Sequence, residues 1–99
     1  MVNTGGEKVF AEEVEEVVKT HPAVEDCLVV GLPDETFGNR VVAVVSLSTP
    51  TGQGDLIAHT KAHLASFKAP KQVVVVERVP RAANGKADYK TARALAEQA

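Results

Sequence analysis

The sequence predicts an α+β fold in which helices pack against a three-stranded, mainly antiparallel sheet. Residues 24–32, 40–48 and 72–77 are rich in β-branched side chains, which is typical of strands. A short polar loop joins the first two runs and favours an antiparallel pair, whereas a helical segment precedes the third run. The 99 residues are enough for one domain with a single modest core.

The first predicted helix covers residues 11–20. Val14, Val17 and Val18 recur at the spacing of one helix face, and Pro22 ends the segment. The charged residues of the helix are expected on its solvent face: Glu12, Glu15, Glu16 and Lys19. The segment before it, residues 3–8, contains Gly5 and Gly6 and is predicted to be flexible.

Two more helices are predicted from their capping residues. Asp55 is expected to cap a helix that runs to about Ser66, and Asp88 is expected to cap a last helix that ends near Glu97. The stripe expected to face the core on the second helix is Leu56, Thr60, His63, Leu64 and Phe67. The apolar face of the last helix is expected to be Tyr89, Ala92, Leu95 and Ala96.

Composition and charge exclude several classes of function. The net charge of -2 and the scattered lysines and arginines give no case for binding nucleic acid or an anionic membrane. No apolar run approaches the roughly 20 residues of a membrane span, and no secretory signal opens the chain, so a cytoplasmic location is expected. Cys27 lies in an apolar run and is predicted to be buried. His59 and His63 are four apart but lack a third ligand, so no metal site is predicted.

The segment from Pro80 to Tyr89 has the strongest local features of a site. Asn84 and Gly85 predict a sharp turn that places Lys86 at an exposed tip. A lysine there can reach phosphate or carboxylate oxygens, although the segment is also compatible with an ordinary solvated loop. It is not a P-loop, because Pro80 and Ala87 stand where that motif needs a glycine and a hydroxyl residue. Phe37, an aromatic between polar neighbours, is either a plug over the sheet or a binding platform.

Four blocks together resemble the C-terminal domain of AMP-forming acyl-CoA synthetases. The first is residues 5–15, which resemble the Gly-Gly-Glu signature block of that family. The second is residues 21–24 followed by residues 30–35 and Gly38, and the last two are residues 67–71 and 80–86. Their order and spacing fit across essentially the whole chain. Ala11 and Lys8 depart from the common proline and asparagine, but neither change removes a group that the reaction needs.

The resemblance implies a two-step reaction. A carboxylic acid and ATP form an acyl-adenylate, and coenzyme A then displaces AMP to give a thioester, while the small C-terminal domain rotates between the two steps. Lys86 matches the catalytic lysine of the first step. The residues that match the coenzyme A side are Gly5, Gly6, Glu7, Phe37, Phe67, Lys68 and Lys71.

The resemblance also implies a missing partner. The phosphate loop, the carboxylate pocket and the ribose-binding aspartate of the family belong to a large N-terminal adenylation domain. The chain is therefore expected to be a fragment, inactive alone, and the Mg²⁺ that accompanies ATP is expected to find its ligands outside it. A lid of a fatty-acyl-AMP ligase and a stand-alone interaction domain remain alternatives. Gly5, Gly6, Glu7 and Lys8 argue against a carrier-loading peptide synthetase.

Overall fold

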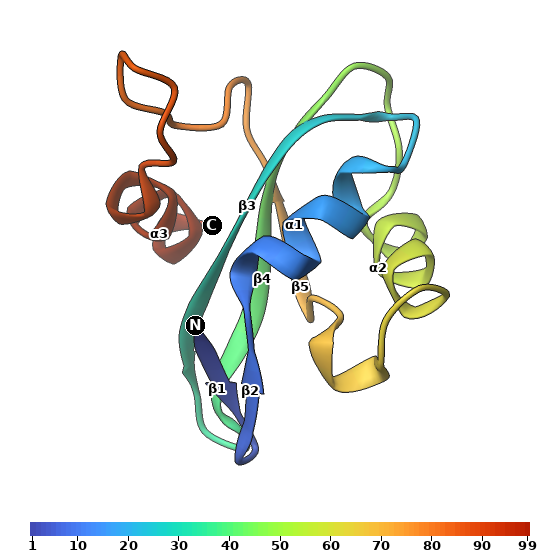
Figure 1. Cartoon of the computed structure of the whole chain (residues 1–99), viewed down its shortest axis with the longest axis vertical. Coiled ribbons are helices and arrows are strands. Elements are labelled where there is room, and N and C mark those ends of the chain that lie inside the picture. Colours follow the sequence, from blue (N-terminus) through green and yellow to red (C-terminus); the bar gives the residue numbers. More distant parts are fainter.

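The computed structural model describes residues 1–99 and contains two small sheets, three α-helices and one 3₁₀ turn (Figure 1). In chain order the elements are β1 (Val2–Thr4), β2 (Glu7–Val9), α1 (Ala11–Lys19), β3 (Val24–Asp34), β4 (Gly38–Leu47), α2 (Gln53–Lys61), η1 (Ser66–Lys68), β5 (Gln72–Val75) and α3 (Tyr89–Gln98). None of the helices has both the length and the apolar character that crossing a membrane requires.

The central sheet has the spatial order β3-β4-β5. β3 and β4 are antiparallel from the pair Val24–Leu47 to the pair Asp34–Gly38. β5 runs parallel to β4, because α2 returns the chain to the far end of the sheet before β5 begins. The predicted α+β fold is confirmed, with the antiparallel ladder the longer of the two.

Both faces of this sheet are covered, which explains why its strands are apolar throughout. Alternate side chains of β3 and β4 point to opposite faces. Those that pack with α1 and α2 are Cys27, Val29, Val41, Ala43 and Val45. Those that pack with α3 are Leu28, Val30, Leu32, Val42 and Val44. Figure 1 shows α3 on one side of the sheet and α1 and α2 on the other.

The opening segment is an ordered hairpin, so the prediction of a flexible start was wrong. β1 and β2 pair from Val2–Val9 to Thr4–Glu7. Gly5 and Gly6 form the two-residue turn with φ values of 58° and 84°, a geometry that glycine adopts readily. Val2 is buried against the sheet, where a β-carbon on Gly31 would lie only 3.0 Å from its side chain. The glycine at 31 therefore makes room for the hairpin.

α2 differs from its prediction at both ends. Gly52, not Asp55, is the N-cap residue, and the Asp55 carboxylate instead accepts hydrogen bonds from Thr51 Oγ1 (3.0 Å) and bonds His21 Nε2 (2.8 Å). The helix ends at Lys61, before the predicted end near Ser66, and the short turn η1 begins at Ser66. Leu56 is buried as expected, but Phe67 is 40% exposed.

The cap predicted for α3 is confirmed. Asp88 Oδ1 accepts a hydrogen bond from the Thr91 backbone N–H at 3.1 Å, and Thr91 Oγ1 donates to Asp88 Oδ2 at 2.7 Å. These bonds satisfy free groups of the first turn. Ala92 and Ala96 are buried and pack α3 against the sheet. The Asp88 cap fixes the start of α3 at Tyr89, three residues after Lys86.

Candidate active-site surfaces

Lys86 lies at the end of a tight hairpin formed by residues 81–87. The backbone N–H of Gly85 donates to the carbonyl of Ala82 at 2.8 Å, and the N–H of Ala82 donates to the carbonyl of Lys86 at 2.9 Å. Gly85 has a φ of 87°, which fits a type I turn closed by a glycine bulge. Asn84 Oδ1 accepts from the N–H of Lys86 at 3.1 Å. The sharp turn predicted from Asn84 and Gly85 is therefore present.

The side chain of Lys86 is exposed, and none of the ion pairs in the structure involves it. The hydrogen bonds of the turn order its backbone, whereas its ammonium forms no ion pair with a carboxylate of the chain. An unpartnered cation at an ordered tip is free to meet an anionic group from outside the chain.

Phe37 lies in the turn between β3 and β4. Asp34 Oδ1 accepts from the backbone N–H groups of Thr36 (2.9 Å) and Phe37 (3.1 Å), which shapes this turn. The carbonyl of Phe37 accepts from the N–H of Gly5 at 2.8 Å, so the turn is tied to the tip of the β1–β2 hairpin. The ring remains 39% exposed and therefore offers a surface rather than filling the core.

A pocket of about 180 Å³ lies where these two turns meet η1. Its lining residues are Thr4, Gly5, Glu7, Phe37, Phe67 and Lys71. The Lys71 ammonium sits 4.3 Å from the centroid of the Phe37 ring, within the range of a cation–π contact. The structure thus brings together five of the seven residues predicted for the coenzyme A side, and Gly6 lies on the same hairpin turn.

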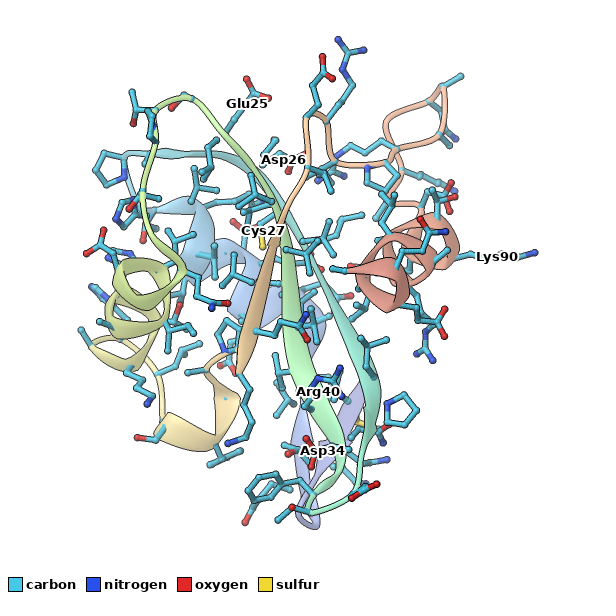
Figure 2. The ribbon with its side chains drawn as sticks, turned by 180° about the vertical axis from the view of Figure 1, so that it is seen from behind. Glu25, Asp26, Cys27, Asp34, Arg40 and Lys90 are labelled. Atoms are coloured by element: carbon cyan, nitrogen blue, oxygen red, sulfur yellow. The ribbon has the colours of Figure 1, made fainter.

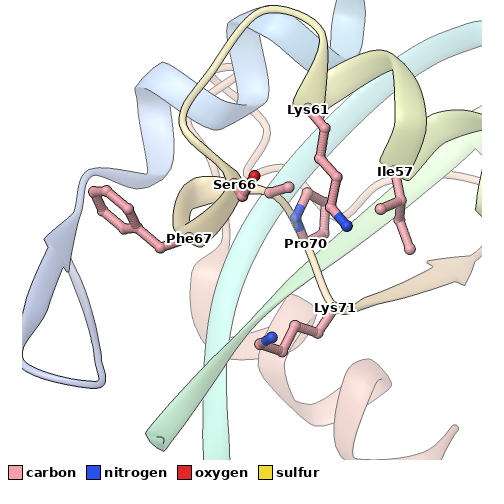
Figure 3. Close-up of a pocket in the computed structure, with 7 residues that line it drawn as sticks. Ile57, Lys61, Ser66, Phe67, Pro70 and Lys71 are labelled. Atoms are coloured by element: carbon pink, nitrogen blue, oxygen red, sulfur yellow. The ribbon is translucent and has the colours of Figure 1, made fainter.

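A second, larger pocket of about 490 Å³ adjoins the first (Figure 3). Phe67 and Lys71 line both pockets, so the two hollows form one continuous polar and aromatic surface. The remaining lining residues are Ile57, Lys61, Ser66, Ala69 and Pro70. Lys61 extends the positive charge of this surface beyond the residues predicted from the sequence.

Lys68 was also predicted for the coenzyme A side, but it lines neither pocket. Its ammonium forms an ion pair with Glu13 Oε1 at 2.7 Å and lies 5.9 Å from the centroid of the Phe67 ring. The contact links η1 to α1. An incoming phosphate would have to compete with Glu13 for this lysine.

The two candidate surfaces lie at opposite ends of the molecule. Figure 1 shows the orange-red turn that precedes α3 at one end and the blue β1–β2 turn at the other. The longest dimension of the molecule is 33 Å. Lys86 lines neither pocket, so the two surfaces do not form one continuous site.

A buried carboxylate links the elements behind these surfaces, and the sequence prediction missed it. Glu15 was expected on the solvent face of α1, but it is only 7% exposed. Its Oε2 accepts from the Val29 backbone N–H at 2.9 Å and from the Tyr89 hydroxyl at 2.8 Å. Burial, followed by the hydrogen bond to Glu15, raises the pKa of Tyr89. Glu15 lies four residues after Ala11 and three before Val18, both of which are buried. This spacing puts position 15 on the same helix face as the core residues and is the signal that could have revealed its burial.

The histidines and the cysteine do not form a metal site. His59 Nε2 bonds Thr20 Oγ1 at 2.8 Å, and His63 Nδ1 bonds the carbonyl of His59 at 2.9 Å. No three histidine, cysteine, aspartate or glutamate side chains are arranged to hold a metal ion. Cys27 is fully buried, as predicted, and burial raises the pKa of its thiol.

Comparison with known proteins assigns the chain to a family. The family model for the AMP-binding enzyme C-terminal domain matches residues 13–86. A medium-chain acyl-CoA ligase of Mycobacterium avium is 49% identical over 94 residues, which cover 93% of this chain and 17% of that ligase. A 4-chlorobenzoate–CoA ligase of Arthrobacter sp is 45% identical over 95 residues, which cover 94% of this chain and 18% of that ligase.

Solved structures agree with this assignment. A fatty acyl CoA synthetase of Mycobacterium tuberculosis matches with a TM-score of 0.90 and 33% identity, over 95% of this chain and 19% of that one. The chain spans less than a fifth of the length of each of these relatives. From its sequence and its structure alike, the chain belongs to the family of AMP-binding enzyme C-terminal domains.

Proposed function

We propose that this chain is the mobile C-terminal domain of an AMP-forming acyl-CoA synthetase and acts with an N-terminal adenylation domain. In the first step a carboxylate oxygen attacks the α-phosphorus of ATP, forming an acyl-adenylate and releasing pyrophosphate. In the second step the thiol of coenzyme A loses its proton and attacks the acyl carbon, forming a thioester and releasing AMP. The observation that carries the proposal is the separation of the two candidate surfaces, one for each step.

Lys86 is assigned to the first step. The attacking carboxylate and the phosphates of ATP are both anionic, so their approach is opposed by charge repulsion. A positioned ammonium offsets this repulsion and stabilises the charge that develops in the transition state. The exposure of Lys86 and its lack of an ion-pair partner support the assignment, because the ammonium would lose no existing bond on reaching the reactants.

The pocket at the other end is assigned to coenzyme A. Phe37 and Phe67 are 39% and 40% exposed, which leaves ring surface for an adenine to stack on. Lys71 beside them carries a charge that suits the phosphates of the nucleotide. Gly5, Gly6 and Glu7 form the adjacent hairpin tip, and apart from the residues on either side of it no atom lies within 4 Å of a β-carbon added at Gly6. That open side suits the narrow pantetheine arm. Lys68 would contribute only by exchanging Glu13 for a phosphate.

The acyl group is selected outside this chain. The relatives that resemble it at 49% and 45% identity are named for a medium-chain acyl group and for 4-chlorobenzoate, which differ in shape and length. Because similar C-terminal domains occur in ligases of such different acids, this domain does not determine which acid is bound. The ligands of the Mg²⁺ that accompanies ATP likewise lie outside this chain. The chain alone is inactive, and only the longer enzyme catalyses the reaction.

The proposal is tested by separating the two half-reactions in the full-length enzyme that contains this domain. Lys86→Ala is expected to slow pyrophosphate release in single turnover by about 10²–10³-fold, the usual cost of one preorganised charge-stabilising group. Transfer of the acyl group from preformed adenylate to coenzyme A should change far less. Lys90→Ala is the matched control, since Lys90 is also exposed and points outward from α3 (Figure 2).

Three outcomes would argue against the proposal. Equal losses in both half-reactions would contradict the role of Lys86. An intact protein that forms the adenylate but never the thioester would favour a fatty-acyl-AMP ligase. An intact protein that forms no adenylate from a broad panel of carboxylic acids would favour a non-catalytic interaction domain.

A further inference from the structure

Arg81 joins the lysine turn to the central sheet. Its Nε donates to Asp26 Oδ2 at 2.7 Å, and its Nη2 donates to Asp26 Oδ1 at 2.8 Å. Its Nη1 donates to the carbonyl of Gly85 at 3.2 Å. One guanidinium group therefore bonds both a carboxylate on β3 and the backbone of the residue that precedes Lys86.

The Asp26 end of this contact belongs to the central sheet. Asp26 lies on β3 beside the segment that leads to α3, as Figure 2 shows. Its Oδ1 also accepts from the backbone N–H of Cys27 at 2.9 Å, and Cys27 is fully buried in the core. The Arg81 guanidinium holds the pKa of the Asp26 carboxyl below its ordinary value. Asp26 is thus an ionised anchor attached to the most buried strand pair.

The other hydrogen bonds of residues 81–87 are made within the segment 80–88. They define the internal shape of the turn but not its direction relative to the sheet. The base of the turn is held by Val79, which is buried, and by the start of α3. Arg81 is the residue that holds the tip.

We propose that Arg81 and Asp26 are positioning residues for Lys86: their ion pair holds the Gly85 carbonyl and thereby directs the ammonium of the next residue. The proposal rests on the function proposed above for Lys86. A long, flexible lysine side chain loses accuracy when its backbone can swing, and a misplacement of about 1 Å can cost 10²-fold in rate. Arginine suits the role because its planar fork presents several donors in fixed directions, which a lysine ammonium cannot reproduce.

The first test uses the 99-residue chain alone and does not depend on catalysis. Backbone NMR order parameters are measured for Gly85 and Lys86 in the parent and in Arg81→Gln. We expect values near 0.85 in the parent and below about 0.6 in the variant, the ranges of rigid and flexible backbone. Arg78→Gln is the matched control, because Arg78 is exposed, lies three residues earlier in the same connection between β5 and α3, and forms no ion pair. Unchanged order at Gly85 and Lys86 in Arg81→Gln would overturn the proposal.

The second test measures adenylation by the full-length enzyme. We expect Arg81→Gln and Asp26→Asn each to lower the single-turnover rate of pyrophosphate release about 10- to 100-fold. The KM for ATP and the rate of thioester formation from preformed adenylate should be nearly unchanged. Arg81→Lys should recover part of the rate, and the double variant should be no slower than either single one. A purely structural role would instead lower both half-reactions together.

A parallel measurement on Lys86→Ala separates the two ideas. If Lys86→Ala leaves adenylation unchanged, the function proposed for the lysine fails. If Lys86→Ala slows adenylation while Arg81→Gln does not, only the positioning role fails. If both variants slow adenylation and the order of the turn falls only in Arg81→Gln, the positioning role is supported.

Discussion

The buried carboxylate of Glu15 gives the sharpest prediction about stability. β3 is an edge strand of the central sheet, so backbone N–H groups on its free side need a partner other than a strand. Glu15 Oε2 supplies one for Val29 at 2.9 Å and also accepts from the Tyr89 hydroxyl at 2.8 Å. The substitution Glu15→Ala would leave both donors without this acceptor.

The expected loss follows from these two bonds. A hydrogen bond to a charged group contributes about 1.5–3 kcal/mol, so two of them contribute about 3–6 kcal/mol. Releasing the cost of burying the carboxylate offsets part of this. We therefore expect Glu15→Ala to lower the free energy of unfolding by about 3 kcal/mol, which corresponds to a fall in Tm of about 12 °C or more for a domain of this size.

Urea unfolding of the chain, followed by circular dichroism, measures this loss. Glu15→Gln keeps a side-chain oxygen that can accept both bonds and should lose clearly less than Glu15→Ala. Tyr89→Phe should cost about 1–2 kcal/mol in the parent and almost nothing when Glu15 is already alanine, because the two residues share one bond. Glu16→Ala is the control, since the Glu16 side chain is 75% exposed and its loss should stay within about 0.5 kcal/mol. If Glu15→Ala is as mild as Glu16→Ala, the reasoning is wrong.

Three further predictions concern the cap, the acid sensitivity and the hairpin tip. Asp88→Ala should destabilise the chain by about 1 kcal/mol in urea unfolding through loss of the α3 cap, and Glu97→Ala should not. The pKa of the folded Asp26 carboxyl lies below its ordinary value because of Arg81, so its contribution to stability is present above the unfolded pKa and is lost as the pH falls. The difference in stability between the parent and Arg81→Gln should therefore be constant near pH 6 and shrink from about pH 5 downward; a difference that grows in acid would contradict this. In the full-length enzyme, Gly6→Leu should slow thioester formation more than pyrophosphate release, because Gly6 has a φ of 84° and forms the proposed passage, whereas Gly54→Leu should affect neither step selectively.

The fold could largely be predicted from the sequence because its main features are periodic. β-branched runs predicted the strands, the valines of α1 predicted its buried face, and Asp88 predicted the start of α3. The turn at Lys86 was predictable because Gly85 favours a positive φ that few other residues adopt.

The features that were missed depend on contacts between distant residues. Gly5 and Gly6 suit either a flexible segment or a tight turn, and burial of Val2 and Val9 beside the sheet decides for the turn. Glu15 has a charged side chain on an amphipathic helix, and the partners that bury it come from β3 and α3. The ion pair of Arg81 and Asp26 joins residues 55 apart, which no local pattern indicates.

The gathering of the coenzyme A residues is likewise a tertiary effect. Residues from the β1–β2 tip, the β3–β4 turn and η1 line one pocket although they are far apart in the chain. The resemblance to the family predicted their role, whereas their proximity comes from the hairpin packing that the sequence analysis missed. Lys61 was not predicted, since it joins the pocket only because α2 lies beside η1 and the start of β5.

The most direct test of the two-surface account is lysine footprinting of the full-length enzyme in its two states. An amine-reactive reagent is applied with a bound ATP analogue and carboxylate, and again with an acyl-adenylate analogue and coenzyme A. The account predicts that Lys86 is protected and Lys71 reactive in the first state, and that the pattern reverses in the second. Protection of both lysines together, or a Lys86 whose reactivity is the same in both states, would contradict it.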